Sequence, residues 1–94
     1  MIKNFLDIIV LAELRKSSPL SGYDILDRIH KKFAVLISSG TIYSLLYSME
    51  RKGLIEGEST YGKRVYTLTD KGTNAISTFL KSKGELQRFL GTLF

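Results

Sequence analysis

The strongest constraint on the fold of this 94-residue chain is a short amphipathic segment near its middle. Its apolar residues follow the spacing i, i+3, i+4 and i+7: Ile42, Leu45, Leu46 and Met49. That spacing places them on one face of an α-helix. Ser38 or Ser39 can accept a hydrogen bond from the free amides at the helix start, and Gly53 can end the helix in a left-handed conformation. We therefore predict a helix here with its apolar face turned toward a core.

Two further helices are predicted before this segment. The first spans residues 3–16 and is apolar on most sides, with its remaining positions filled by Lys3, Asn4, Asp7 and Glu13. Pro19 interrupts it, because proline cannot continue the hydrogen-bond ladder. Ser21 then fits an N-cap, with Asp24 three positions later as a short-armed capping box. The second helix covers about 22–33, and the apolar run 34–37 predicts a brief extended segment.

After the third helix, the pattern changes to that of a β-hairpin followed by a long helix. Residues 54–59 and 64–69 are strand-like runs joined by residues 60–63. Thr69 fits the cap of a last helix that begins near Asp70. The order helix, helix, helix, hairpin is that of a winged helix-turn-helix. We therefore expect a mainly α fold with a small β-hairpin: a winged helix-turn-helix domain over residues 1–69 and a C-terminal helix over 70–94.

Length and composition exclude several classes of protein. The chain has the length of one domain and has no cysteine, and its single histidine, His30, cannot build a histidine-rich zinc site. We expect no metal and no cofactor. The longest apolar run, residues 8–12, is far too short to cross a bilayer, and the N-terminus lacks the features of a signal peptide. A cytoplasmic protein without a membrane partner is therefore expected.

The outward face of the third helix carries the clearest functional signal. The net charge of +5 is spread along the chain and hints only weakly at a polyanionic partner. The outward face, however, offers hydroxyls, two tyrosines and an arginine: Thr41, Tyr43, Ser44, Tyr47, Ser48 and Arg51. Hydroxyls donate to phosphate oxygens or base edges, and tyrosine rings can lie against sugars or thymine methyl groups. This face is typical of one that binds double-stranded DNA.

Two neighbouring features extend the predicted DNA contacts. Amides around Ser39, Gly40 and Thr41 can form an anion site for a phosphate, and Lys63 and Arg64 at the hairpin turn can reach the DNA backbone or minor groove. The predicted DNA-binding residues are Ser38, Ser39, Gly40, Thr41, Tyr43, Ser44, Tyr47, Lys63 and Arg64. Two alternatives stay open: the tyrosines pack against a neighbouring element, and the two cations form an ordinary charged turn.

Catalysis finds little support in the sequence. Glu56 and Glu58 share one strand face, but a solvated face explains them better than acid–base chemistry, because nothing nearby would serve as their partner. The chain also lacks a glycine-rich phosphate loop, so we predict that it is not an enzyme. A different class remains as the alternative to DNA binding, namely a winged-helix module whose tyrosine face docks on another protein.

Four motifs resemble the PadR-like winged-helix transcriptional regulators, over roughly residues 5–75. These are Gly22-Tyr23-Asp24-Ile25, the run from Ser38 to Tyr43, the run from Met49 to Ile55, and the run from Tyr66 to Gly72. The resemblance implies a dimeric DNA-binding repressor whose third helix enters the major groove and whose wings touch the flanking backbone. The chain departs from the family where Ser39 and Ser44 replace the usual prolines, and its wing lacks the usual arginine-proline-arginine run.

The last helix is predicted to join two copies of the chain. Its apolar residues keep a spacing of three and four that a small monomer could hardly cover, and Lys83 interrupts them. The predicted homodimer interface comprises Phe5, Ile76, Phe79, Leu80, Lys83, Leu86, Phe89, Leu90 and Leu93. The alternative is that this helix packs onto its own domain. No tryptophan is present to suggest an effector site, and the sequence names neither the operator nor the regulated genes.

Overall fold

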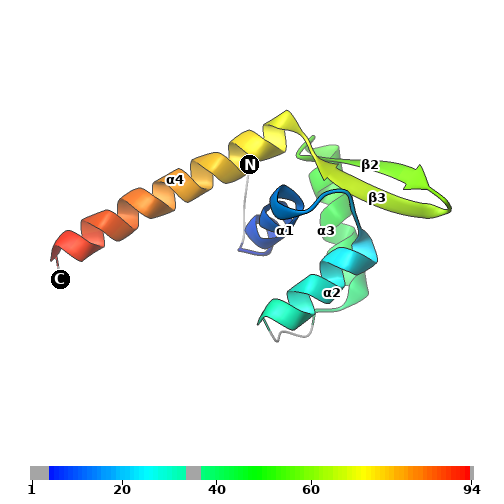
Figure 1. Ribbon diagram of the computed structural model, residues 1–94, viewed down its shortest axis with the longest axis horizontal. Coiled ribbons are helices and arrows are strands. Elements are labelled where there is room, and N and C mark those ends of the chain that lie inside the picture. Colours follow the sequence, from blue (N-terminus) through cyan, green and yellow to red (C-terminus); the bar gives the residue numbers. More distant parts are fainter. Residues whose placement is uncertain (1–4, 34–36, 94) are drawn as a thin grey trace.

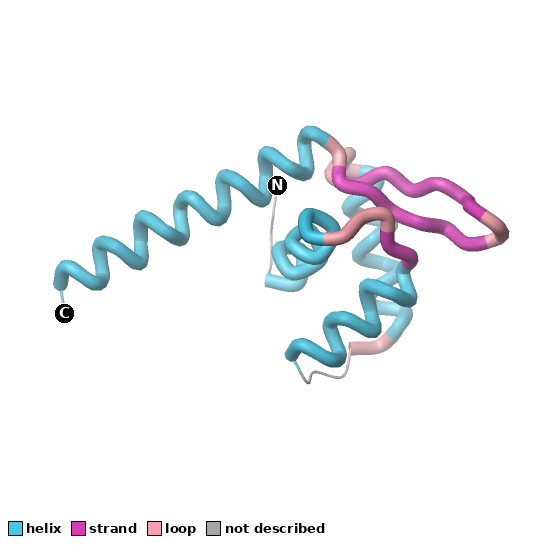
Figure 2. The backbone as a smooth tube through the Cα atoms, in the orientation of Figure 1, coloured by secondary structure: helices cyan, strands magenta, loops and turns pink. Residues whose placement is uncertain are grey.

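The described part of the chain forms four helices and a small antiparallel sheet, confirming the predicted winged-helix fold (Figures 1 and 2). The computed structural model describes residues 5–33 and 37–93, with only the backbone given for Phe33 and residues 83–93. In chain order the elements are α1 (Phe5–Lys16), β1 (Leu20–Ser21), α2 (Gly22–Phe33), α3 (Ser39–Arg51), β2 (Ile55–Thr60), β3 (Lys63–Leu68) and α4 (Asp70–Leu93). Most of the extended segment predicted over 34–37 lies outside the described residues.

Side-chain caps fix where α2 and α3 begin. The Asp24 backbone N–H donates to Ser21 Oγ at 3.0 Å, and the Ser21 N–H donates to Asp24 Oδ2 at 3.0 Å, which is the predicted capping box. Of the two serines before α3, Ser38 is the cap, since its Oγ accepts the Thr41 N–H at 3.1 Å. Gly53 follows the end of α3 with φ at +79°, as predicted.

The sheet has the order β1-β3-β2, with both pairs antiparallel. β2 and β3 are the predicted hairpin, joined by the two residues Tyr61 and Gly62, both of which have positive φ. The two-residue strand β1 was not predicted. It pairs Leu20 with Tyr66 and thereby ties the segment before α2 to the wing. Two residues carry too little periodicity to reveal a strand in the sequence.

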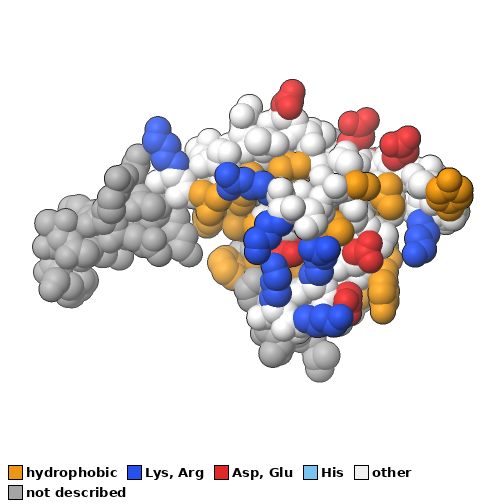
Figure 3. Space-filling view, in the orientation of Figure 1, with side chains coloured by type: hydrophobic (Ala, Val, Ile, Leu, Met, Phe, Trp, Pro, Cys, Tyr) orange, Lys and Arg blue, Asp and Glu red, His pale blue; other side chains and the backbone are white. Residues whose placement is uncertain are grey.

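The core lies between the three N-terminal helices and the sheet, and includes Leu11, Ile25, Leu46, Tyr66 and Ile76. The prediction that Asp7 and Glu13 merely occupy the polar side of the first helix is wrong, because both side chains are buried. Glu13 accepts a hydrogen bond from Lys32 Nζ at 2.8 Å and lies 3.7 Å from Arg28 Nη1. It therefore joins α1 to α2. Lysine and arginine side chains gather on one face of the molecule (Figure 3).

The helix α4 starts on the core and then projects away from it (Figure 1). Thr69 caps its start as predicted, since Thr69 Oγ1 accepts the Gly72 N–H at 3.0 Å and donates to the Leu54 carbonyl at 2.9 Å. A side chain at Gly72 would meet that carbonyl, because a Cβ there would lie 2.0 Å from its oxygen. The projection gives the chain a radius of gyration of 14.4 Å, against about 12 Å for a compact chain of this length.

Candidate nucleic-acid interface

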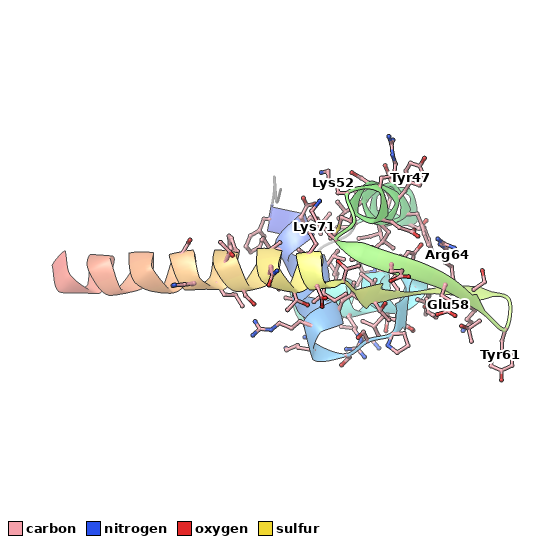
Figure 4. The ribbon with its side chains drawn as sticks, turned by 90° about the horizontal axis from the view of Figure 1, so that it is seen from above. Tyr47, Lys52, Glu58, Tyr61, Arg64 and Lys71 are labelled. Carbon is pink, nitrogen blue, oxygen red and sulfur yellow. The ribbon has the colours of Figure 1, made fainter. Side chains whose placement is uncertain are left out.

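The outward face of α3 is open, as the spacing of its apolar residues predicts. Tyr47 is 64% exposed and points away from the helix (Figure 4), and the Arg51 guanidinium carbon lies 5.7 Å from the centre of its ring. Thr41 and Ser44 are exposed on the preceding turns, while Ile42 and Met49 are buried. This face therefore offers an aromatic ring, an arginine and hydroxyl groups together, without a carboxylate before Glu50 at its end.

Tyr43 is both exposed toward a possible ligand and packed against a neighbouring helix, which are the two alternatives that the sequence left open. Its side chain is 48% exposed, yet one edge of the ring lies on Gly22 at the start of α2. A Cβ at Gly22 would lie 2.3 Å from Tyr43 Cε1. Glycine at this position therefore lets the ring lie against α2, which fixes its direction while leaving half of it accessible to a ligand.

At the start of α3 the predicted anion site is smaller than expected. The Thr41 N–H is satisfied by Ser38 Oγ, whose hydroxyl also shares a hydrogen bond of 2.9 Å with Thr41 Oγ1. The first backbone hydrogen bond of the helix runs from the Ile42 N–H to the Ser38 carbonyl at 3.2 Å. By helix geometry, the N–H groups of Ser39 and Gly40 come before that bond and point out of the helix end. These two exposed residues retain the geometry for a phosphate.

The two wing cations have different surroundings. Lys63 is exposed beside the turn, whereas Arg64 Nη2 lies 2.6 Å from Glu50 Oε2 on α3. The side chain of Arg64 therefore reaches back from the hairpin turn toward α3 (Figure 4), and its predicted contact with DNA stays a prediction. The tip itself holds Tyr61, which is fully exposed and which sequence reasoning missed. Its place in the turn, next to Gly62, was the available signal.

A shallow groove separates α3 from the wing. Its lining consists of Tyr43, Tyr47, Glu50, Arg51, Arg64 and Tyr66, and a second hollow beside it is lined by Ser44, Tyr47, Ser48, Arg51 and Lys52. Arg51 and Lys52 were not among the predicted contacts. Within the part of the chain that the structure describes, no group of three metal-ligating side chains is found and no helix is long and apolar enough to span a membrane.

The family model of the PadR-like transcriptional regulators matches residues 10–78. This range includes α1 from Val10 onward, all of α2 and α3, and the wing. The chain belongs to the PadR-like family. The resemblance inferred from the motifs at Gly22-Tyr23 and at the start of α3 is thereby confirmed. A comparison with curated proteins finds no match.

Solved structures of PadR-like proteins share the fold. The PadR-like regulator BC4206 from Bacillus cereus is 29% identical with a TM-score of 0.78, covering 94% of this chain and 89% of its own. A PadR-like transcription factor from Bacteroides fragilis is 26% identical with a TM-score of 0.80, covering 95% and 89%. Bacillus subtilis PadR, solved in complex with operator DNA, is 30% identical over 80% of this chain with a TM-score of 0.73. This PadR-like chain matches 46% of that protein's length.

The residues predicted to join two copies of this PadR-like chain have different surroundings. Ile76 is fully buried in the chain's own core, so it has no surface left for a second copy and that assignment is wrong. Phe5 and Leu80 are 63% and 43% exposed, and Phe79 is partly buried against the core. The side chains of Lys83, Leu86, Phe89, Leu90 and Leu93 lie outside the described residues.

Proposed function

We propose that this PadR-like chain binds double-stranded DNA as a homodimer and regulates transcription, with repression as the mode that the family resemblance implies. The observation that carries the proposal is the outward face of α3, where Tyr47, Arg51 and exposed hydroxyls stand together. Such side chains contact phosphates, sugars and base edges when a helix enters the major groove. The similarity to Bacillus subtilis PadR, solved with operator DNA, supports the same partner here. A cytoplasmic location remains a prediction.

The dimer defines the expected DNA site. Two copies of α3 related by a two-fold axis meet successive major grooves about 34 Å apart, so the site should be a pseudo-palindrome with half-sites one turn apart. Enrichment of random duplexes on the purified protein, followed by sequencing, should return such a consensus. A stoichiometric protein partner, together with no affinity for any duplex at low salt, would overturn the proposal in favour of a protein-interaction module.

The contribution of α3 is tested by Tyr47→Ala and Arg51→Gln. Tyr47 is a cleaner probe than Tyr43, because Tyr43 also contacts α2. Each substitution should weaken binding to the enriched duplex roughly tenfold or more, since a lost groove contact costs on the order of 1–3 kcal/mol. Fluorescence anisotropy measures the affinity. Lys31→Gln removes an exposed cation that pairs with Asp27 on α2 and serves as the control. Equal affinities for all three variants would contradict the role of α3.

A further inference from the structure

One carboxylate at the end of α3 contacts both strands of the wing. Glu50 Oε2 accepts a hydrogen bond from the Gly57 N–H on β2 at 3.2 Å and one from Arg64 Nη2 on β3 at 2.6 Å. The Glu50 side chain is 29% exposed and that of Arg64 is 48% exposed, so the contact lies at the surface with its carboxylate partly covered. Charge-assisted hydrogen bonds of this length are stronger than neutral ones. Glu50 therefore attaches the wing to the helix that we propose reads DNA.

Gly57 provides the space in which Arg64 lies. A Cβ at this position would stand 2.7 Å from Arg64 Nε and 2.8 Å from its Nη2, so any other residue would displace the guanidinium group from its place across β2. The Arg64 guanidinium carbon is also 5.9 Å from the ring centre of Tyr66, which pairs with Gly57 in the sheet. The Arg64 side chain is thus held by a carboxylate, a strand and an aromatic ring.

Lys63 and Arg64 are adjacent in the sequence, but this geometry gives the two cations different surroundings. Lys63 is exposed next to the turn, while the charge of Arg64 is offset by Glu50. We propose that Glu50 is a positioning residue of the DNA interface, whose carboxylate uses Arg64 to hold the wing at a fixed place beside α3. Arg64 then sets the position of the wing and neutralises no DNA phosphate. This inference rests on the proposed function, because it concerns how the wing meets a duplex.

The salt dependence of binding shows whether Arg64 neutralises a DNA phosphate or only positions the wing. Each phosphate that a protein cation neutralises adds about 0.9 to the slope of log affinity against log salt concentration. The double variant Glu50→Gln/Arg64→Gln removes both charges of the pair and leaves the net charge unchanged. Because the released wing also loses the phosphate contact of Lys63, the slope of the double variant on the enriched duplex should fall by about as much as that of Lys63→Gln. Adding Lys63→Gln to the double variant should lower the slope no further. Lys63→Gln, the matched wing cation, should lower the slope by about one per protomer.

A second readout tests positioning directly. We compare the enriched duplex, extended by about one helical turn at each end, with a version cut at the edges of the half-sites. A wing held beside α3 would contact DNA next to the groove that α3 enters, so the longer duplex should bind the wild type more tightly. The double variant should lose this preference, while Glu58→Gln, which removes an exposed carboxylate from the same hairpin, should keep it. A general loss of folding would weaken both duplexes equally and would also lower the melting temperature.

The outcomes separate the inference from the proposed function. A triple variant Glu50→Gln/Arg64→Gln/Lys63→Gln whose slope falls by about twice the effect of Lys63→Gln alone would show that Arg64 contacts a phosphate of its own, and would overturn the inference alone. A double variant that keeps the wild-type preference for the longer duplex would also overturn it. Wild-type protein without affinity for any duplex at low salt would instead overturn the proposed function.

Discussion

At the scale of single residues, glycines decide where larger side chains lie. Gly22 receives the ring of Tyr43, and Gly57 receives the guanidinium group of Arg64. In each case a Cβ would stand closer than 3.0 Å to the neighbouring side chain. Each large side chain belongs to a different element from its glycine, so the pairing arises only when α2 meets α3 and when β2 meets β3. Residues with no side chain thus fix the direction of the Tyr43 ring, a candidate DNA contact, and of Arg64, the arginine that we propose positions the wing.

Tyr61 occupies a backbone conformation that suits other residues better. Its φ is +51°, beside Gly62 at +78°, in a two-residue hairpin turn. Turns with two positive φ values favour Asn-Gly, because a left-handed conformation is costly for most residues with a Cβ. The side chain is fully exposed, so no packing within the described chain compensates for this cost.

Replacing Tyr61 with asparagine should therefore stabilise the protein. We expect Tyr61→Asn to raise the free energy of unfolding by about 1 kcal/mol, because asparagine tolerates the left-handed region. Chemical denaturation measures the change. Tyr23→Asn is the matched control, since Tyr23 is 68% exposed but lies in the ordinary backbone of α2. The same gain in both variants would show that the effect comes from losing an exposed aromatic ring and not from the turn.

At the scale of elements, the reciprocal bonds between Ser21 and Asp24 join the end of β1 to the start of α2. The pKa of the Asp24 carboxyl lies below its ordinary value of 3.8, chiefly because the carboxylate accepts the Ser21 backbone N–H. A carboxyl whose pKa is lowered by folding stabilises the folded state above its ordinary pKa. That stabilisation is lost as the pH falls through the lowered value.

The capping box should therefore make a pH-dependent contribution to stability. Asp24→Asn should lower the free energy of unfolding by about 0.5–1 kcal/mol at neutral pH, the usual size of a capping effect. The difference from the wild type should shrink as the pH falls below the ordinary carboxyl pKa of 3.8 and through the lowered pKa of Asp24, because Asp24 then becomes protonated as well. Thermal unfolding across this pH range measures the difference in stability, and Glu58→Gln, which removes a different carboxylate, is the control. A difference independent of pH would contradict the charged capping box.

At the scale of the whole molecule, α4 has two parts with different surroundings. Its first turns pack on the core through Gly72 and Ile76, and the remainder projects from the body of the chain (Figure 1). Leu80 lies beyond the packed turns with 43% of its surface exposed, and Phe5 on α1 is exposed as well. Exposed apolar residues on a projecting helix fit the proposed pairing of two copies.

A charge at Leu80 should separate the proposed dimer. We expect Leu80→Glu to give a monomer in sedimentation velocity, because a carboxylate in an apolar interface loses its hydration without gaining a partner. The fold of the chain should survive, since Leu80 is exposed in the single copy. Lys81→Glu adds a carboxylate at the next residue, also exposed, and should leave the dimer intact. If Leu80→Glu remains dimeric, the interface must lie elsewhere.

The sequence by itself determined the helices, the hairpin and the outward face of α3, because periodicity, caps and turn residues act within a few positions. The capping box of Ser21 and Asp24, and Gly53 with its positive φ just after the end of α3, are such local effects. Only the tertiary structure decided that Glu13 is buried, that Ile76 belongs to the core and that Arg64 pairs with Glu50. These contacts join residues at least 14 positions apart or from different elements, and their energies exist only once the chain has brought those elements together.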